Sequence, residues 1–143
     1  MEYFDILNEF GEFTGKVMDR DTCHKEGFWH RAIYGFIINN DGDVLLQRRS
    51  KTKKLWPDLW DITAGGHVLT GEFGEQALIR EVKEETGITN VKPIMNDIFS
   101  LEIIGINGHK KRGKYVSSHV HLNCSFLLEA DDQNIIFDII IVE

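Results

Sequence analysis

A glycine-led loop that runs into an acidic helix constrains this chain more than any other segment. Residues 66–88 read GHVLTGEFGEQALIREVKEETGI, and Glu81, Glu84 and Glu85 fall within about one helical turn. These carboxylates share one helix face, where each like-charge pair at about 6 Å costs on the order of 3 kcal/mol. A bound hard cation such as Mg²⁺ or Mn²⁺ would offset that repulsion; a solvated acidic face is the alternative.

The pattern around the acidic face predicts a helix over residues 74–86. Gly87 is suited to a left-handed cap at its end. The start is weakly specified, because Phe73 stands where Ser, Thr or Asp would be favoured, so we expect tertiary contacts to hold it. One stripe of the helix is apolar and should dock on a core; it consists of Ala77, Leu78 and Val82.

The spacing of the fixed residues in this segment resembles the signature of the Nudix hydrolases, so residues 66–88 are called the Nudix box below. The resemblance implies a loop-helix-loop that holds a divalent metal, Mg²⁺ or Mn²⁺, against a diphosphate. Glycine at the start of the box lets the backbone approach a ligand closely. The implied metal ligands are the carbonyl of Gly66 and the side chains of Glu72, Glu81, Glu84 and Glu85.

Catalytic roles follow from the same resemblance. Arg80 resembles the family arginine that orients the glutamates by pairing with them; a surface ion pair with Glu84 is its alternative role. The expected catalytic set is Glu81, Glu84, Glu85 and Arg80. Glu84 is the general-base candidate inside the box, and Glu102 and Glu129 stay open as carboxylates from elsewhere in the chain.

A longer stretch, about residues 5 to 90, resembles the Nudix branch that includes the type I isopentenyl diphosphate isomerases and their hydrolase relatives. The similarity lies in His30-Arg31-Ala32 and in LLQRRSKTKKLWPDLWDITAGGH. It implies that Arg49, Lys53 and Lys54 lie near the substrate diphosphate, where a guanidinium fork suits phosphate oxygens. Solvated lysines at a strand end are the alternative.

Neighbouring side chains allow two readings each. His67 follows the box glycine and could reach phosphate or metal, or be a plain loop histidine. Three aromatic residues could stack on a base or serve as rim packing: Phe28, Trp56 and Trp60. The basic stretch 109–114 could steer an anionic substrate or be a solvated hairpin tip.

Isomerase chemistry fits the residues less well than hydrolysis. The isomerases use a cysteine acid just before the Gly-His pair, with a histidine and glutamate metal set, but here Gly65 takes the place of that cysteine. Glycine cannot move the proton that allylic isomerisation requires. Cys23 and Cys124 lack CxxC spacing, and we expect reduced structural thiols, with Cys23-His24 as half of a metal site the alternative.

We therefore expect a Mg²⁺-dependent hydrolase that splits the diphosphate linkage of a nucleoside diphosphate derivative. The alternatives are an isopentenyl-diphosphate-isomerase-like enzyme and a non-catalytic nucleotide-binding domain. The net charge of −7 argues against general nucleic-acid binding. No segment approaches 18 apolar residues in a row and no signal peptide is evident, so we expect a cytoplasmic protein that does not associate with membranes.

The predicted fold is one domain over residues 1–143, of the α/β (α+β) class: a Nudix-type α/β/α sandwich with a mixed β-sheet and an N-terminal hairpin. The hairpin covers 3–14, and residues 16–27 are helical or irregular. Further strands are expected at 32–38, 44–49, 60–64, 94–104, 117–129 and 135–142. The apolar C-terminal run, where the family usually has a helix, should pair with its own sheet or with a second subunit as a homodimer.

Overall fold

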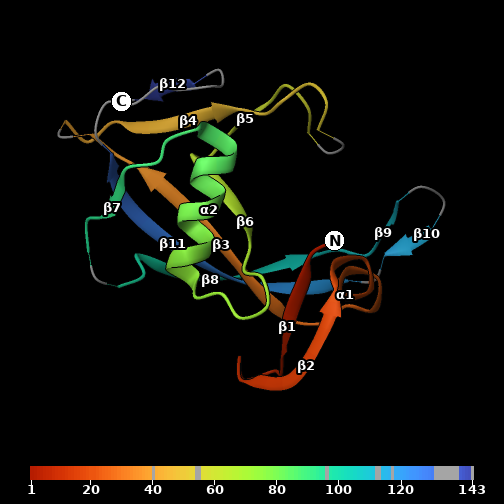
Figure 1. Ribbon diagram of the computed structural model, residues 1–143. Coiled ribbons are helices and arrows are strands. Elements are labelled where there is room, and N and C mark those ends of the chain that lie inside the picture. Colours follow the sequence, from red (N-terminus) through yellow and green to blue (C-terminus); the bar gives the residue numbers. More distant parts are fainter. Residues whose placement is uncertain are drawn as a thin grey trace.

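The computed structural model describes residues 1–39, 41–53, 56–95, 97–111, 114–116, 118–130 and 139–142. Figure 1 shows the elements in chain order. They are β1 (Tyr3–Leu7), β2 (Phe13–Asp19), α1 (Arg20–Glu26), β3 (His30–Ile37), β4 (Val44–Arg48), β5 (Trp60–Asp61), β6 (Ala64–His67), α2 (Gly74–Thr86), β7 (Val91–Pro93), β8 (Ser100–Ile106), β9 (His109–Lys111), β10 (Lys114–Val116), β11 (His119–Ala130) and β12 (Ile139–Val142).

The predicted N-terminal hairpin is confirmed as the antiparallel pair β1 and β2, but β2 continues to Asp19, so the prediction that residues 16–19 are helical or irregular was wrong. Its turn is closed by Asn8, whose side-chain oxygen accepts hydrogen bonds from the backbone N–H groups of Phe10 and Glu12. The following short helix α1 starts at an Asp19 cap and ends at Gly27, which has a φ of 78°. Helix α1 therefore follows the hairpin directly and lies beside it (Figure 1).

The main sheet is mixed and has the order β6-β3-β11-β7, with β8 also paired to β11. Strands β3 and β11 run parallel, and their other pairings are antiparallel. Residues buried along β3 include Ile33 and Ile37, which belong to the main core. The mixed sheet and its helices confirm the predicted α/β class.

Helix α2 covers one face of this sheet (Figure 1) and has the bounds predicted from its sequence pattern. The apolar stripe Ala77, Leu78 and Val82 is fully buried in the main core, and a leucine of that kind contributes about 2 kcal/mol. The helix start has no side-chain cap from Phe73; instead Gln76 Oε1 accepts a hydrogen bond from the Phe73 N–H at 2.9 Å. Packing and Gln76 thus hold the end that the sequence specified weakly.

A smaller sheet consists of β12, β4 and β5. The apolar strand β12 pairs antiparallel with β4, from Ile139 opposite Gln47 to Val142 opposite Val44. This confirms for residues 139–142 the expectation that the C-terminal run pairs with its own sheet; residues 135–138 of the predicted run lie outside the described part of the chain.

The prediction of one strand over 60–64 was wrong, because Ile62 and Thr63 separate two strands of different sheets. The buried Thr63 hydroxyl accepts a hydrogen bond from the Ile37 N–H of β3 at 3.0 Å and donates one to the Leu45 carbonyl of β4. These bonds tie the two sheets together at the point where β5 ends and β6 begins.

The strand expected over 94–104 begins later than predicted. Strand β7 ends at Pro93, and β8 begins only at Ser100. Both pair with β11, and between them Ile94 and Phe99 donate backbone hydrogen bonds to the β11 residues Leu127 and Ser125. Neither described helix is long and apolar enough to cross a membrane.

Candidate metal and diphosphate site

Arg80 lies at the centre of the acidic cluster of the Nudix box. Its Nε and Nη2 atoms donate to the two carboxylate oxygens of Glu72, both at 2.9 Å, and its Nη1 donates to Glu81 at 2.6 Å. Nη2 also donates to the backbone carbonyl of His67 at 2.9 Å. Its distance to Glu84 is 3.9 Å, so the surface pair is the weakest of these contacts. One guanidinium thus fixes the loop and the helix against each other.

The Glu81 carboxylate lies against Gly66. A Cβ at Gly66 would come within 2.1 Å of Glu81 Oε1 and 2.7 Å of Oε2. The Glu81 side chain is only 14% exposed. Because no other residue would leave this space open, the glycine is required here by a close approach rather than by its backbone angle.

Glu85 lies one turn further along α2 than Glu81. Its carboxylate contacts Gly65, the residue that precedes Gly66 in β6. Its Oε2 accepts hydrogen bonds from Gln47 Nε2 at 2.6 Å and from the Gly65 N–H at 3.2 Å. Its Oε1 pairs with Lys53 Nζ at 3.2 Å. The carboxylates of Glu81 and Glu85 therefore both face the glycine pair of β6.

Burial and ion pairing shift the pKa values of Glu72, Arg80 and Glu81 in different directions. Hydrogen bonds from Arg80 hold the pKa of Glu72 below its ordinary value, and the bond to Glu72 raises the pKa of Arg80. Burial raises the pKa of Glu81, against the opposing pull of Arg80. A cation beside Glu81 would favour its charged form and relieve that cost.

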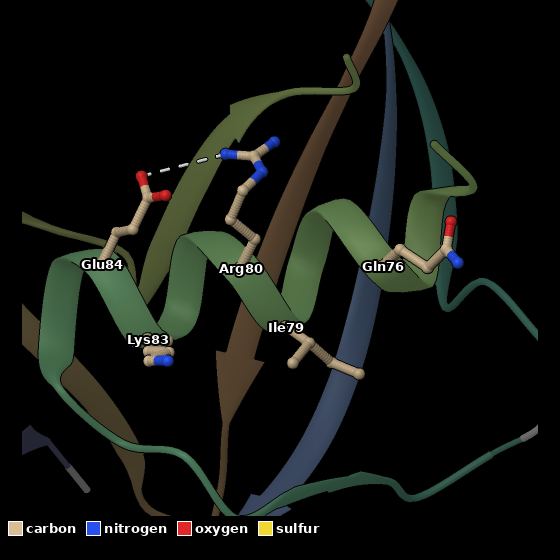
Figure 2. A pocket seen from close by; sticks show the side chains of 5 residues that line it. All are labelled: Gln76, Ile79, Arg80, Lys83 and Glu84. Carbon is tan, nitrogen blue, oxygen red and sulfur yellow. Dashed lines mark ion pairs between the residues drawn. The ribbon is translucent and has the colours of Figure 1, made fainter. Parts of the chain in front are cut away.

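Glu84 differs from its neighbours because its side chain is 61% exposed. It projects from the same side of α2 as Arg80 (Figure 2). With Gln76, Ile79, Arg80 and Lys83 it lines a shallow groove on the helix. The other two general-base candidates, Glu102 and Glu129, lie on β8 and β11.

The expected substrate-binding residues do not all lie beside the box. Arg49 pairs with Asp61 at 2.6 Å, and Lys53 pairs with Glu85, so both lie at the end of β4 that adjoins the box. Lys54 is outside the described residues. Trp56 and Trp60 are 68% and 45% exposed, and Arg48 lies 5.9 Å from the Trp60 ring centre.

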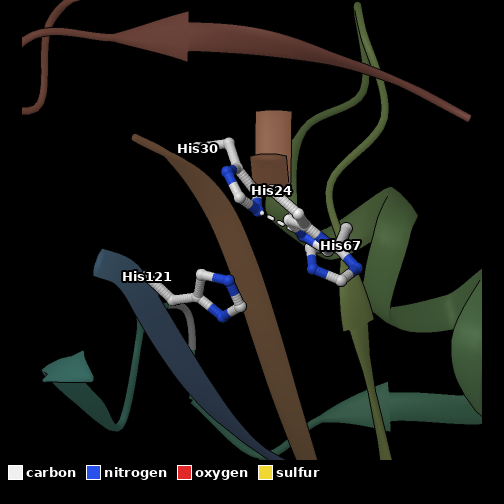
Figure 3. Close-up of side chains that lie close together, drawn as sticks. All are labelled: His24, His30, His67 and His121. Carbon is white, nitrogen blue, oxygen red and sulfur yellow. Dashed lines mark hydrogen bonds between the residues drawn. The ribbon is translucent and has the colours of Figure 1, made fainter. Parts of the chain in front are cut away.

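The ring of His67 lies against the rings of three other histidines (Figure 3). One ring nitrogen from each ring lies within 4.8 Å of the others. This group, called the histidine cluster below, consists of His24, His30, His67 and His121. Burial, followed by the charges of nearby residues, lowers the pKa of His67 to about 2, so its imidazole is neutral.

Sequence reasoning missed the histidine cluster, since its members come from α1, β3, β6 and β11. The sequence signals were the Cys23-His24 pair and His67, each with metal binding as one of its alternatives; in the structure His24 belongs to the cluster, but Cys23 does not. Cys23 is buried with Phe4 and Ile6, and burial raises the pKa of its thiol to about 11. Both cysteines are free thiols.

Comparisons with known proteins agree with the geometry of the box. Residues 28–134 match the description of the NUDIX domain. Over 88 residues the chain is 46% identical to an uncharacterized Nudix hydrolase of Listeria monocytogenes, covering 62% of this chain and 52% of that protein. Over 92 residues it is 36% identical to an isopentenyl-diphosphate Delta-isomerase of Corynebacterium diphtheriae, covering 64% and 50%. The chain thus spans about half the length of these relatives.

Among solved structures, DR0079 of Deinococcus radiodurans has a TM-score of 0.61 at 24% identity, covering 99% of this chain and 83% of that one. At this identity the likeness concerns the fold alone. The match over residues 28–134, which contains the whole box, is decisive for the family. The chain belongs to the Nudix family.

Proposed function

We propose that residues 1–143 act as one Nudix domain with Mg²⁺-dependent hydrolase activity on the diphosphate linkage of a nucleoside diphosphate derivative. One observation carries the proposal. The carboxylates of Glu81 and Glu85, with side chains only 14% and 11% exposed, converge on the Gly65-Gly66 backbone, where a side chain would block the approach of Glu81. Mg²⁺ favours such a set of carboxylate and carbonyl oxygens.

The donors fit a hard cation in number and type. Glu81 and Glu85 would hold it, with Glu84, Glu72 and the Gly66 carbonyl as further ligands. When bound, the ion supplies charge neutralisation of phosphate oxygens and a lowered pKa for an attacking water. Arg80 holds Glu72 and Glu81 in place through hydrogen bonds of 2.6 to 2.9 Å, and so organises the ligand set before substrate binds.

Basic residues at the end of β4 would bind the substrate. Lys53 is half exposed and already contacts Glu85, so its ammonium could exchange that carboxylate for a phosphate oxygen when metal occupies the cluster. Arg49 is held by Asp61 and presents its fork beside the same strand end. Both residues would stabilise the charge of the leaving phosphate.

Isopentenyl diphosphate isomerisation is the second candidate, because one of the relatives above carries that name. Gly65 argues against it. A Cβ at this position would lie 2.9 Å from Tyr34 Cδ1 and 3.3 Å from Ile62 Cδ1, so the site has no room for the cysteine acid that the isomerases use. The observed packing favours hydrolysis.

The test is product formation from a panel of nucleoside diphosphate sugars, dinucleoside polyphosphates, oxidised nucleotides, coenzymes and isopentenyl diphosphate, with and without Mg²⁺. We expect Mg²⁺-dependent release of phosphate or nucleoside monophosphate, reduced at least about 100-fold by Glu85→Gln, which removes a charge but no volume. Glu75→Gln is the matched control, since Glu75 is exposed in the first turn of the same helix. Binding without turnover would reject the hydrolase, and conversion to dimethylallyl diphosphate would favour the isomerase.

A further inference from the structure

Arg31 on β3 and Asp5 on β1 lie outside the Nudix box, yet both contact the loop that leads from β6 into α2. We propose that they are positioning residues of the metal site. They hold residues 68–72, called the box loop below, in the geometry that the acidic cluster requires. The inference rests on the proposed function, because it concerns the same Mg²⁺ site, and both residues act through Glu72 rather than on the metal or the substrate.

Arg31 contacts the box loop at both of its ends. Its backbone carbonyl accepts a hydrogen bond from the Val68 N–H at 3.1 Å. Its Nη2 atom donates to the backbone carbonyl of Glu72 at 3.0 Å. A guanidinium suits the second contact because it offers several N–H donors in a rigid plane. The two ends of the loop are therefore fixed to one residue of the main sheet.

Strand β1 holds the middle of the box loop, which lies beside it (Figure 1). The Thr70 N–H donates to the Tyr3 carbonyl at 2.9 Å. The Gly71 N–H donates to Asp5 Oδ2 at 3.2 Å. The same Asp5 oxygen lies 3.4 Å from Arg31 Nη2, so Asp5 joins the loop to the arginine.

The distances indicate that Arg31 serves the loop more than its ion pair. A separation of 3.4 Å from Asp5 is long for a hydrogen bond, whereas 3.0 Å to the Glu72 carbonyl is ordinary. Phe13 of β2 lies against the guanidinium, with 4.8 Å between Arg31 Cζ and the ring centre. The Arg31 and Asp5 side chains are only 22% and 21% exposed. Contacts from both strands of the hairpin therefore direct this guanidinium at the box loop.

Glu72 connects the box loop to the acidic cluster. Arg31 binds its backbone carbonyl, and Arg80 binds both oxygens of its carboxylate. Arg80 in turn donates to Glu81, a proposed metal ligand, at 2.6 Å. A shift of the box loop would therefore displace Arg80 and with it Glu81. Contacts of this kind, one step behind the ligands, commonly set the affinity of a metal site.

The first test is calorimetric titration of the whole chain with Mg²⁺ alone. Removing the positive charge of Arg31 should by itself tighten cation binding, because like charges repel. Our proposal predicts the opposite: Arg31→Gln should weaken Mg²⁺ binding about tenfold or more, and Asp5→Asn should also weaken it. Arg20→Gln and Glu2→Gln are controls with the same charge changes. They break an exposed ion pair of 2.6 Å next to β1 and should leave Mg²⁺ affinity within about twofold of wild type.

The second test is amide hydrogen exchange of the metal-free chain, which does not depend on activity. In Arg31→Gln and Asp5→Asn, residues 68–72 should lose protection by about tenfold or more, while the buried stretch 77–82 of α2 keeps its wild-type protection. Retained protection of α2 shows that the variants are folded. The two control variants should exchange like wild type throughout.

The outcomes separate this inference from the proposed function. Unchanged exchange of the box loop in both variants, or Mg²⁺ affinity in Arg31→Gln equal to or tighter than wild type, would overturn the positioning role. If Glu85→Gln weakens Mg²⁺ binding but Arg31→Gln does not, the inference alone fails. Absence of saturable Mg²⁺ binding in wild type would refute the proposed function and this inference together.

Discussion

Replacing Gly66 by alanine tests whether the close approach of Glu81 to β6 organises the box. The new Cβ would lie 2.1 Å from Glu81 Oε1 and 2.2 Å from its carboxylate carbon. Ordinary contacts of a Cβ begin near 3.4 Å, so the carboxylate must move by about an ångström or more. Such a movement also breaks the 2.6 Å bond from Arg80.

The two expected effects differ in size. Misplacing a catalytic group by about 1 Å can cost about 100-fold in rate, which corresponds to about 2.7 kcal/mol. A hydrogen bond to a charged group contributes about 1.5 to 3 kcal/mol to stability. Alanine also lowers the conformational entropy of the unfolded chain, which stabilises the folded variant by about 0.4 to 1 kcal/mol. We therefore expect Gly66→Ala to reduce the free energy of unfolding by about 1 to 2 kcal/mol.

The assay is turnover of the best substrate from the panel at saturating Mg²⁺, together with urea unfolding. Gly105→Ala is the matched control, because a Cβ there would have nothing within 4 Å, and it should leave turnover unchanged. If Gly66→Ala also retained full turnover, the reasoning that a close carboxylate-to-backbone approach forms the metal site would be wrong.

Two further perturbations address the arginine and the buried imidazole. Arg80→Lys keeps the charge but loses the guanidinium that donates two hydrogen bonds to Glu72. Urea unfolding should show that the free energy of unfolding falls by about 2 kcal/mol, whereas Lys83→Arg on the same helix should change it little. His67 has a folded-state pKa near 2, below its ordinary value of 6.5, so protonation favours the unfolded chain as pH falls below 6.5. In chelator-treated protein, His67 should therefore contribute a loss of about 1.4 kcal/mol between pH 7.5 and 5.5, and His67→Gln should have a correspondingly flatter pH profile of stability. Equal profiles for the two proteins would contradict the buried, neutral state of His67.

The elements that could be predicted from the sequence are those with strong local signals. Helix α2 has its predicted bounds because an apolar stripe and a glycine stop coincide, and Gly87 does adopt a positive φ of 80°. The division of residues 60–64 into two strands could not be predicted, because it accompanies hydrogen bonds in which Thr63 accepts from Ile37 and donates to Leu45, on two other strands.

One part of the candidate site could likewise be predicted from the sequence, and another part could not. Spacing along one helix was enough to predict that Glu81 and Glu85 would share a face. It gave no indication that Gln47 would donate to Glu85 across 38 residues of sequence. The histidine cluster depends on the pairing of β3 with both β6 and β11, so no local pattern could reveal it.

Calorimetric titration of the chelator-treated chain with Mg²⁺ tests the central claim most directly. Mg²⁺ prefers oxygen ligands to imidazole, so its binding reports on the carboxylates of the box and not on the histidine cluster. The account predicts saturable Mg²⁺ binding that Glu85→Gln weakens at least about tenfold, or about 1.4 kcal/mol, while Glu75→Gln leaves it unchanged. Equal Mg²⁺ affinity in wild type and Glu85→Gln would contradict a metal site at the acidic face of α2.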